Sequence, residues 1–204
     1  MDNKKLMKVP TKVDSELGNF LVYNENAQGI KFKTLFEDKR TIIVFIRHFF
    51  CYVCQDFVRA LAQDINFGDL KQKNINLYVV GCGEISGIKN FSLETKFPSQ
   101  LIYVDTQRFT YNKLGMMRAE TISQVRSGKK SEDTKTSTFC GLCKTACSII
   151  TKKRQGDIYQ LGGTYIFETD GKIIYTFVDD SSNGHCSSKE ILDLIQKYSQ
   201  NIEN

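Results

Sequence analysis

Two cysteines stand three residues apart, at Cys51 and Cys54, in the stretch RHFFCYVCQDF at 47–57. This stretch directly follows TIIVFI at 41–46, a continuous apolar and β-branched run that is typical of a strand covered on both faces. The residues that follow, QDFVRALAQDI at 55–65, place their apolar side chains on one face of a helix. The cysteine pair is therefore predicted to lie where a buried strand turns into a helix.

This position suits thiol redox chemistry. Residues i and i+3 in the first turn of a helix bring their Cα atoms to roughly 5–6 Å, within the ~4.4–6.8 Å that a disulfide requires. Unpaired N–H groups and the helix dipole can lower the pKa of a thiol there from ~8.5 to ~3.5–7.5. Arg47 and His48 would add positive potential, although alternation along the strand points one of them away. The spacing allows both a reversible disulfide and an activated nucleophile.

Packing and metal binding are the alternatives to a redox role for this pair. Cysteine also serves as a small apolar core residue, and four thiolates form a zinc site. A second cluster, CGLCKTAC, contains Cys140, Cys143 and Cys147, which would supply resolving thiols or complete such a site. Their spacing also fits the buried stripe of a helix, which we favour for them. For the first pair we favour redox chemistry, because CxxC at a strand-to-helix turn is a redox pattern.

Three further residues carry weaker signals. Cys186 lies beside His185, and a Cys–His pair invites a nucleophile-and-base interpretation. Adjacent residues at a helix start usually point in different directions, so His185 is expected to be a capping or surface residue. Cys82 directly follows a predicted strand and is expected in the core.

Bulk properties narrow the class of protein. The 204 residues fit one domain, and 41% hydrophobic with 25% charged residues indicates a globular chain. The net charge of +5 comes with short basic clusters that lack interleaved aromatics, so no nucleic-acid partner is expected. The sequence contains neither a secretory apolar run nor a membrane-length one, which predicts a cytoplasmic protein with no membrane partner. Structural disulfides are rare in that compartment, and the seven cysteines form no regular framework.

The remaining pattern alternates strands and helices before a hairpin and a last helix. It predicts an α/β sandwich with a central mixed β-sheet flanked by helices. We expect a flexible N-terminal segment at 1–17 and one domain at 18–204, with a polar, Cys-rich insert at about 118–156. The expected elements are two short strands within 21–35 around a turn containing Gly29, strands at 75–81 and 101–105, helices at 88–97, 111–114 and 187–198, and a hairpin at 163–180 around Asp170–Gly171.

Several motifs in this order resemble one known family. They are VFIRHFFCYVCQDFVRAL, VVGCGE, LIYVDTQRFTYNKLGM and GDIYQLGGTYIF, and the similarity runs from about residue 18 to 198. The chain resembles the peroxiredoxin-like (AhpC/TSA antioxidant) branch of the thioredoxin superfamily, whose members include thioredoxin-like reductases and a prostamide/prostaglandin F synthase. The resemblance implies a thioredoxin-like fold with a redox-active CxxC and no cofactor or metal.

The resemblance also shows where this chain departs from true peroxiredoxins, whose loop reads Pro-x-x-x-Thr-x-x-Cys. Laid over it, Cys54 takes the peroxidatic position, Cys51 the threonine and Arg47 the proline. The arginine that peroxiredoxins place before the penultimate strand falls at Gly162, and Arg47 is a candidate to compensate. Gly163–Thr164 occupy the region of the thioredoxin cis-proline. Thioredoxin logic makes Cys51 the nucleophile, whereas the peroxiredoxin alignment favours Cys54 if peroxide is the substrate.

The sequence therefore predicts a thiol-dependent oxidoreductase with Cys51, Cys54 and Arg47 as its catalytic residues. Its substrate would be a peroxide or a disulfide, and a thioredoxin- or glutathione-type reductant would recycle it. The alternative is a redox-inactive thioredoxin-like binding module or a thiolate metal-binding protein. The order of attack by the two cysteines, the substrate and the oligomeric state stay open.

Overall fold

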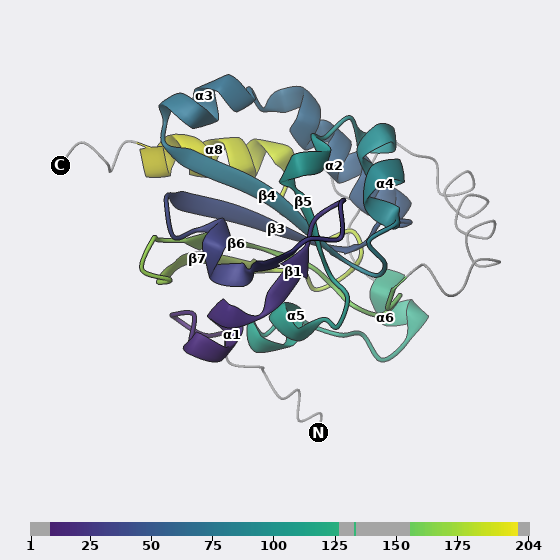
Figure 1. Cartoon of the computed structure of the whole chain (residues 1–204). Helices are drawn as coiled ribbons and strands as arrows, with labels where there is room; N and C mark the ends of the chain where they lie inside the picture. Colours follow the sequence, from purple (N-terminus) through teal and green to yellow (C-terminus); the bar gives the residue numbers. More distant parts are fainter. Residues whose placement is uncertain (1–8, 127–132, 134–155, 200–204) are drawn as a thin grey trace.

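A computed structural model describes residues 9–126, 133 and 156–199. In this part of the chain, seven strands form one mixed sheet in the order β2-β1-β5-β4-β3-β6-β7 (Figure 1). The strands are β1 (Leu21–Tyr23), β2 (Gly29–Lys31), β3 (Arg40–His48), β4 (Ile75–Cys82), β5 (Ile102–Asp105), β6 (Gly163–Phe167) and β7 (Ile173–Val178). The helices are α1 (Ser15–Asn19), η1 (Phe32–Leu35), α2 (Tyr52–Asp64), α3 (Phe67–Gln72), α4 (Gly87–Thr95), η2 (Ser99–Leu101), α5 (Phe109–Lys113), α6 (Ile122–Arg126) and α8 (Ser188–Ser199).

Strand β3 is an interior strand of the sheet, next to the central strand β4. It pairs in parallel with β4 on one side and antiparallel with β6 on the other. Strands β4 and β5 are parallel, while β6 pairs antiparallel with β7 and β1 antiparallel with β5. The predicted central mixed sheet is therefore confirmed.

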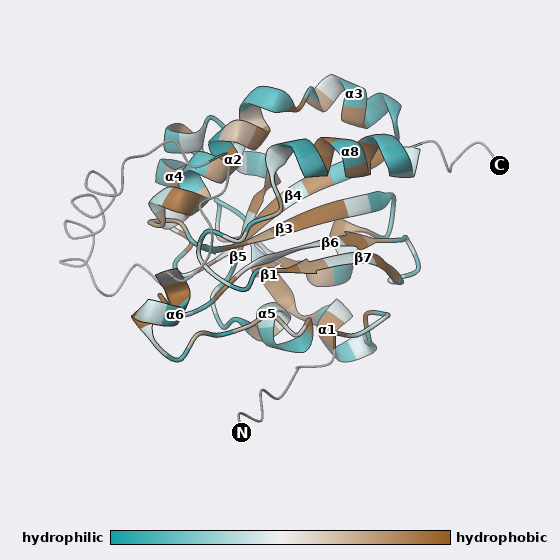
Figure 2. Cartoon of the chain, turned by 180° about the vertical axis from the view of Figure 1, so that it is seen from behind, coloured by the Kyte–Doolittle hydropathy of each residue, from teal (hydrophilic) through white to brown (hydrophobic). Residues whose placement is uncertain are grey.

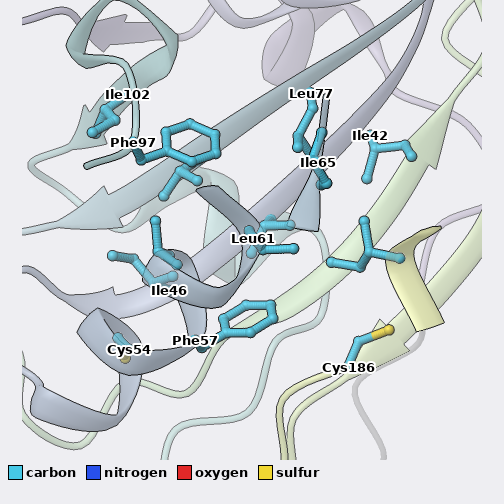
Figure 3. Close-up of a cluster of buried hydrophobic side chains, with 14 of the residues drawn as sticks. Ile42, Ile46, Cys54, Phe57, Leu61, Ile65, Leu77, Phe97, Ile102 and Cys186 are labelled. Atoms are coloured by element: carbon cyan, nitrogen blue, oxygen red, sulfur yellow. The ribbon is translucent and has the colours of Figure 1, made fainter. Parts of the chain in front are cut away.

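Helices cover both faces of the sheet and create two cores. Figure 1 shows α2, α3, α4 and α8 over one face and α1 and α5 over the other. Alternation along β3 sends Ile42, Val44 and Ile46 into the first core, and Ile43 and Phe45 into the second. Apolar side chains on both faces give β3 and β4 the brown of Figure 2, and Figure 3 shows the first core in close-up.

Most expected elements are found within a few residues of their predicted bounds, with two local corrections. Gly29 begins β2 and is not part of the turn, which spans residues 24–28. Helix α4 ends at Thr95, earlier than expected, because Lys96 adopts a left-handed conformation with φ of 63°.

Residues 11–13, which lie within the predicted N-terminal segment 1–17, pair with the β6–β7 hairpin. The Val13 amide donates to the carbonyl of Gly171, and the Ile173 amide donates to that of Thr11. The hairpin end offers unpaired backbone groups, and these two bonds satisfy some of them. Sequence patterning at 9–17 is too short and polar to reveal such pairing.

The predicted insert at about 118–156 is described only at its two ends and at residue 133. Helix α6 occupies Ile122–Arg126, and an isolated bridge joins Arg118 to Gln160. The expected helical stripe of Cys140, Cys143 and Cys147 lies outside the described residues.

Candidate active site

The CxxC pair lies at the predicted junction of strand and helix. The Cys51 amide donates to the His48 carbonyl over 3.1 Å, which forms the turn between β3 and α2. Cys51 is the N-cap of α2 and has an extended backbone. Its Sγ accepts a hydrogen bond of 3.4 Å from the amide of Cys54. One of the orphan N–H groups of the helix start is thus aimed at a sulfur.

The ring of Phe49 fixes the turn that carries the pair. A Cβ at Gly81 would lie 2.6 Å from this ring, and a Cβ at Gly87 would lie 2.8 Å from it. Only glycine leaves space for the ring at these two positions. The Gln55 side chain also donates to the Phe49 carbonyl at 2.9 Å. The turn is therefore held by β4, α4 and α2 together.

Arg47 brings a cation into contact with the pair. Its Nη1 lies 3.5 Å from Cys51 Sγ, and its Nη2 donates to the carbonyl of Ile158 at 2.6 Å. A break in the β3–β4 register between Phe45 and His48 falls at Arg47. Such irregularities re-aim side chains beside active sites. The Cys82 thiol donates to the Arg47 carbonyl and so supports the same backbone.

The surroundings shift the pKa values of the two thiols in opposite directions. A hydrogen bond from the Cys54 thiol, assisted by the Arg47 charge and the Cys54 amide, holds the pKa of Cys51 well below its ordinary value despite burial. Burial, followed by the neighbouring Cys51 sulfur, raises the pKa of Cys54 well above its ordinary value. Negative charge is therefore favoured on Cys51, while Cys54 keeps its proton and donates it.

His48 does not add the positive potential that the sequence allowed for it. Burial lowers its pKa to about 4, so its ring is neutral at pH 7. Of the two basic residues that end β3, only Arg47 brings a charge to the sulfurs. The reason is burial and not direction, because His48 and Cys51 still influence each other's pKa.

His185 was expected at the surface or as a cap, and that expectation is wrong. Its side chain is only 2% exposed, and Nε2 lies 3.6 Å from Cys54 Sγ. Nδ1 lies 2.6 Å from Oδ2 of Asp179, and the ring stacks on Phe57 of α2 at 5.0 Å between centroids. The polar pair has a physical reason to be buried: each partner compensates the other for lost hydration. Sequence reasoning missed both His185 and Asp179.

Cys186 points away from its neighbour, as expected. It is buried, and its Sγ lies 4.0 Å from the hydroxyl of Tyr175. Cys82 is also buried, as predicted for a core residue. Burial raises the pKa of each of these two thiols to about 12, so neither is an activated nucleophile.

Gly162, where the family alignment places an arginine, has no space for any side chain. A Cβ there would lie 2.0 Å from the carbonyl oxygen of Phe45 and 2.9 Å from Oδ2 of Asp179. Because the chain entering β6 approaches β3 so closely here, an arginine at this position would require the strands to separate. Arg47 is thus the residue placed to supply a cation to the cysteines.

Access to the sulfurs is narrow. Cys51 is 5% exposed and Cys54 is fully covered. In Figure 3, Cys54, Phe57 and Leu61 follow one another along α2 beside the other side chains of the first core. Cys51, Cys54, Cys82 and Cys186, the cysteines in the described part, are all free thiols. The same part of the chain contains no group of three or more potential metal ligands. No helix within the described ranges combines the length and apolarity that crossing a membrane requires.

Known proteins are similar in sequence to this chain over most of its length. A family model described as AhpC/TSA antioxidant enzyme matches residues 60–181. Peroxiredoxin-like 2C of Homo sapiens is 32% identical over 186 residues, which cover 90% of this chain and 80% of the relative. Prostamide/prostaglandin F synthase of Xenopus tropicalis is 30% identical, covering 87% of this chain and 85% of the relative.

Solved structures share the fold at lower identity. A cysteine-to-serine mutant of peroxiredoxin 6 of Arenicola marina superimposes with a TM-score of 0.60 at 16% identity, covering 92% of this chain and 75% of the other. Peroxidoxin BcpB of Mycobacterium tuberculosis also gives 0.60, at 12% identity, covering 97% and 100%. The predicted thioredoxin-like α/β fold is confirmed.

Proposed function

We propose that this chain, which belongs to the AhpC/TSA antioxidant enzyme family, is a thiol peroxidase. Within the thioredoxin superfamily it is a peroxiredoxin-like member. In this proposal Cys51 attacks the peroxide and Cys54 resolves the product, which reverses the order that the peroxiredoxin alignment favoured for a peroxide substrate. One observation carries the assignment: Cys51 Sγ lies 3.4 Å from the amide of Cys54 and 3.5 Å from Nη1 of Arg47. Both groups stabilise a thiolate on Cys51, whereas the pKa of Cys54 is raised by burial and by the Cys51 sulfur.

The first step is attack of the Cys51 thiolate on the terminal oxygen of a hydroperoxide. The S–O bond forms as the O–O bond breaks, which gives a Cys51 sulfenic acid and an alkoxide. The alkoxide then takes a proton from water and leaves as the alcohol. Arg47 lies beside the sulfur and would stabilise the negative charge as it moves onto the departing oxygen.

The second step uses Cys54. Its sulfur attacks Cys51 sulfur, the S–O bond breaks, and hydroxide leaves with the Cys54 proton as water. The product is a Cys51–Cys54 disulfide. An external dithiol or two monothiols, of the thioredoxin or glutathione type, would return it to two thiols and be oxidised to a disulfide in turn. A reducing compartment such as the cytoplasm would supply them.

Burial favours a peroxide over a protein disulfide as the oxidant. Cys51 is 5% exposed, so few atoms of a reactant reach its sulfur without movement of the protein. A hydroperoxide presents a terminal oxygen on a thin chain. A disulfide must bring a bulkier sulfur in line with Cys51, together with the substituents on both of its sulfurs. The second oxidant therefore requires a wider opening of the site.

A prostanoid endoperoxide is a second candidate substrate, favoured by the similarity to prostamide/prostaglandin F synthase. Its O–O bond would undergo the same two steps. Cys51 would attack one oxygen to give a sulfenate ester, the other oxygen would leave as an alkoxide and take a proton, and Cys54 would displace the second alkoxide. The products are a diol and the Cys51–Cys54 disulfide. The chain would have to open further for this substrate than for hydrogen peroxide.

A single-turnover experiment tests the assignment. The reduced wild type, Cys51→Ser and Cys54→Ser are mixed with hydrogen peroxide, quenched with dimedone and an alkylating reagent, and mapped by peptide mass spectrometry. The chain has no tryptophan, so mass is a better readout than fluorescence. We expect a Cys51–Cys54 disulfide in the wild type, a trapped Cys51 sulfenic acid in Cys54→Ser and no reaction in Cys51→Ser. Rapid oxidation of Cys54 in Cys51→Ser would contradict the order, and wild-type reaction in both variants would contradict the site.

A further inference from the structure

The loop between β7 and α8 places a buried histidine against the second cysteine of the pair. His185 Nε2 lies 3.6 Å from Cys54 Sγ, and His185 Nδ1 lies 2.6 Å from Asp179 Oδ2. The three residues therefore form a chain of contacts from Asp179 through His185 to Cys54. Neither the family resemblance nor the alignment to peroxiredoxins pointed to this chain of contacts.

The ring orientation is fixed by packing. His185 stacks on Phe57, one helical turn after Cys54 on α2, with 9° between the ring planes. Asp179 is itself anchored, because its amide donates to the Gly162 carbonyl at 3.1 Å. With the Asp179 carboxylate 2.6 Å from Nδ1, the other ring nitrogen is left to face the sulfur. A histidine held in this way exchanges a proton with the sulfur without moving.

We propose that His185 is the catalytic base of the resolving step, and that Asp179 positions it. The proposal rests on the proposed function, since it concerns the second of its two steps. His185 Nε2 takes the proton from Cys54 as this sulfur attacks the Cys51 sulfenic acid. The imidazolium returns the proton to the departing hydroxide, so that a disulfide and one water are formed and no net proton is consumed.

The need for such a base follows from the surroundings of Cys54. Burial and the nearby Cys51 sulfur hold the pKa of Cys54 well above its ordinary value, so a free thiolate is rare at neutral pH. When Cys51 becomes a sulfenic acid, its sulfur loses the negative charge. The Cys54 thiol then no longer donates a hydrogen bond to an anionic sulfur, so its proton is held less tightly. The charges that reach His185 are the Asp179 carboxylate, the Cys51 thiolate and Arg47. Of these, the Cys51 charge raises the pKa of His185 and disappears on oxidation. The pKa of the ring therefore falls when the sulfenic acid forms, which frees Nε2 to accept the Cys54 proton.

The decisive variant is His185→Gln, which keeps a polar side chain beside Cys54 but has no basic nitrogen. We expect disulfide formation to slow by about 10²-fold or more, in line with the loss of a general base. Formation of the Cys51 sulfenic acid should stay within about threefold of the wild type, because Arg47 and the Cys54 amide are untouched. Asp179→Asn should slow the resolving step by about tenfold, since the ring loses the charge that supports its imidazolium form.

The pH profile separates a base from a structural role. In the wild type, the resolving rate should level off with pH once the Cys54–His185 pair has lost its extra proton. In His185→Gln, only hydroxide is left to deprotonate Cys54, so the rate should keep rising by about tenfold per pH unit. Cys186→Ser is the matched control. It changes the next residue of the same loop, whose sulfur faces Tyr175, and should leave both steps at the wild-type rate.

The outcomes are distinct. A wild type whose Cys51 is not oxidised by hydrogen peroxide would overturn the proposed function and this proposal with it. A wild type that forms the disulfide, beside a His185→Gln with the same resolving rate and pH profile, would overturn this proposal alone. Should His185→Gln not fold, His185→Ala leaves a ring-sized space beside Phe57. Added imidazole should then restore part of the resolving rate, and a failure to do so in the folded variant would also overturn it.

Discussion

Removing the Arg47 charge is the perturbation with the largest expected effect short of removing a cysteine. Arg47→Met keeps much of the side-chain length but deletes the cation that lies 3.5 Å from Cys51 Sγ. Unit charges at this distance, with an effective dielectric constant of about 20, attract by about 5 kcal/mol. The Cys54 amide and the Cys54 thiol remain and retain part of the stabilisation. Loss of one donor to a developing anion usually costs ~10²–10³ in rate, which is our expectation for peroxide reduction at pH 7.

The assay is the second-order rate of Cys51 oxidation by hydrogen peroxide, followed by quenched-flow mass spectrometry across pH. In the wild type the pKa of Cys51 is held low, so the rate should already be near its plateau at neutral pH. In Arg47→Met that pKa rises, so the rate should keep climbing into the alkaline range. The gap between the two proteins should narrow as pH rises, and the residual gap measures stabilisation of the departing oxygen alone.

A conservative variant and a distant control variant test whether the loss comes from the Arg47 charge. Arg47→Lys keeps a charge but not the fork that also donates to Ile158, so it should recover only part of the rate. Arg40→Met is the matched control, because Arg40 begins the strand that Arg47 nearly ends, about 23 Å away at the usual rise per residue. That distance exceeds the Debye length at physiological salt, ~8 Å. An Arg47→Met with wild-type rate and pH profile, or an equal loss in Arg40→Met, would refute the reasoning.

Three further predictions concern the frame around the site. Tyr111→Phe removes a buried hydroxyl that donates to the Ile46 and Val80 carbonyls, so urea unfolding followed by circular dichroism should show a loss of about 1–3 kcal/mol. In the same assay, Gly162→Ala should lower the free energy of unfolding by about 3 kcal/mol. The control is Gly18→Ala, whose added Cβ would meet its nearest atom at an ordinary 3.5 Å and should leave the free energy of unfolding unchanged. Equal effects of the two variants would show that the close approach to β3 at Gly162 is not rigid. Iodoacetamide at pH 8 should leave Cys82 and Cys186 unmodified in the folded protein, because burial raises the pKa of each to about 12. Peptide mapping checks this, and alkylation of either thiol would contradict it.

The position of the cysteine pair could be predicted because it depends on local pattern. A β-branched apolar run followed by an amphipathic helix indicates a strand-to-helix turn, and the first turn of a helix fixes where residues i and i+3 lie. Cys51 and Cys54 occupy those places. The direction of Arg47 could not be predicted, because the register break between Phe45 and His48 has no signature in the sequence.

His185 could not be found by local pattern, because a long-range pairing brings it to the site. The sheet topology explains how it gets there. β6 runs antiparallel to β3, and β7 antiparallel to β6, so β7 ends at the same edge of the sheet as β3. The loop that begins at Asp179 therefore starts beside the CxxC turn. Strand order between β3 and the hairpin would have had to be known first, and the sequence does not specify it.

The most direct test of the central claim is the pH dependence of alkylation of Cys51 and Cys54, measured separately in the reduced wild type. Iodoacetamide reacts with thiolates, and peptide mass spectrometry resolves the two sites even though they are three residues apart. Cys51 should react first, with a midpoint well below that of an ordinary thiol, while Cys54 stays protected until alkaline pH. Faster modification of Cys54, or equal midpoints at the ordinary thiol value, would contradict the assignment of Cys51 as the thiolate.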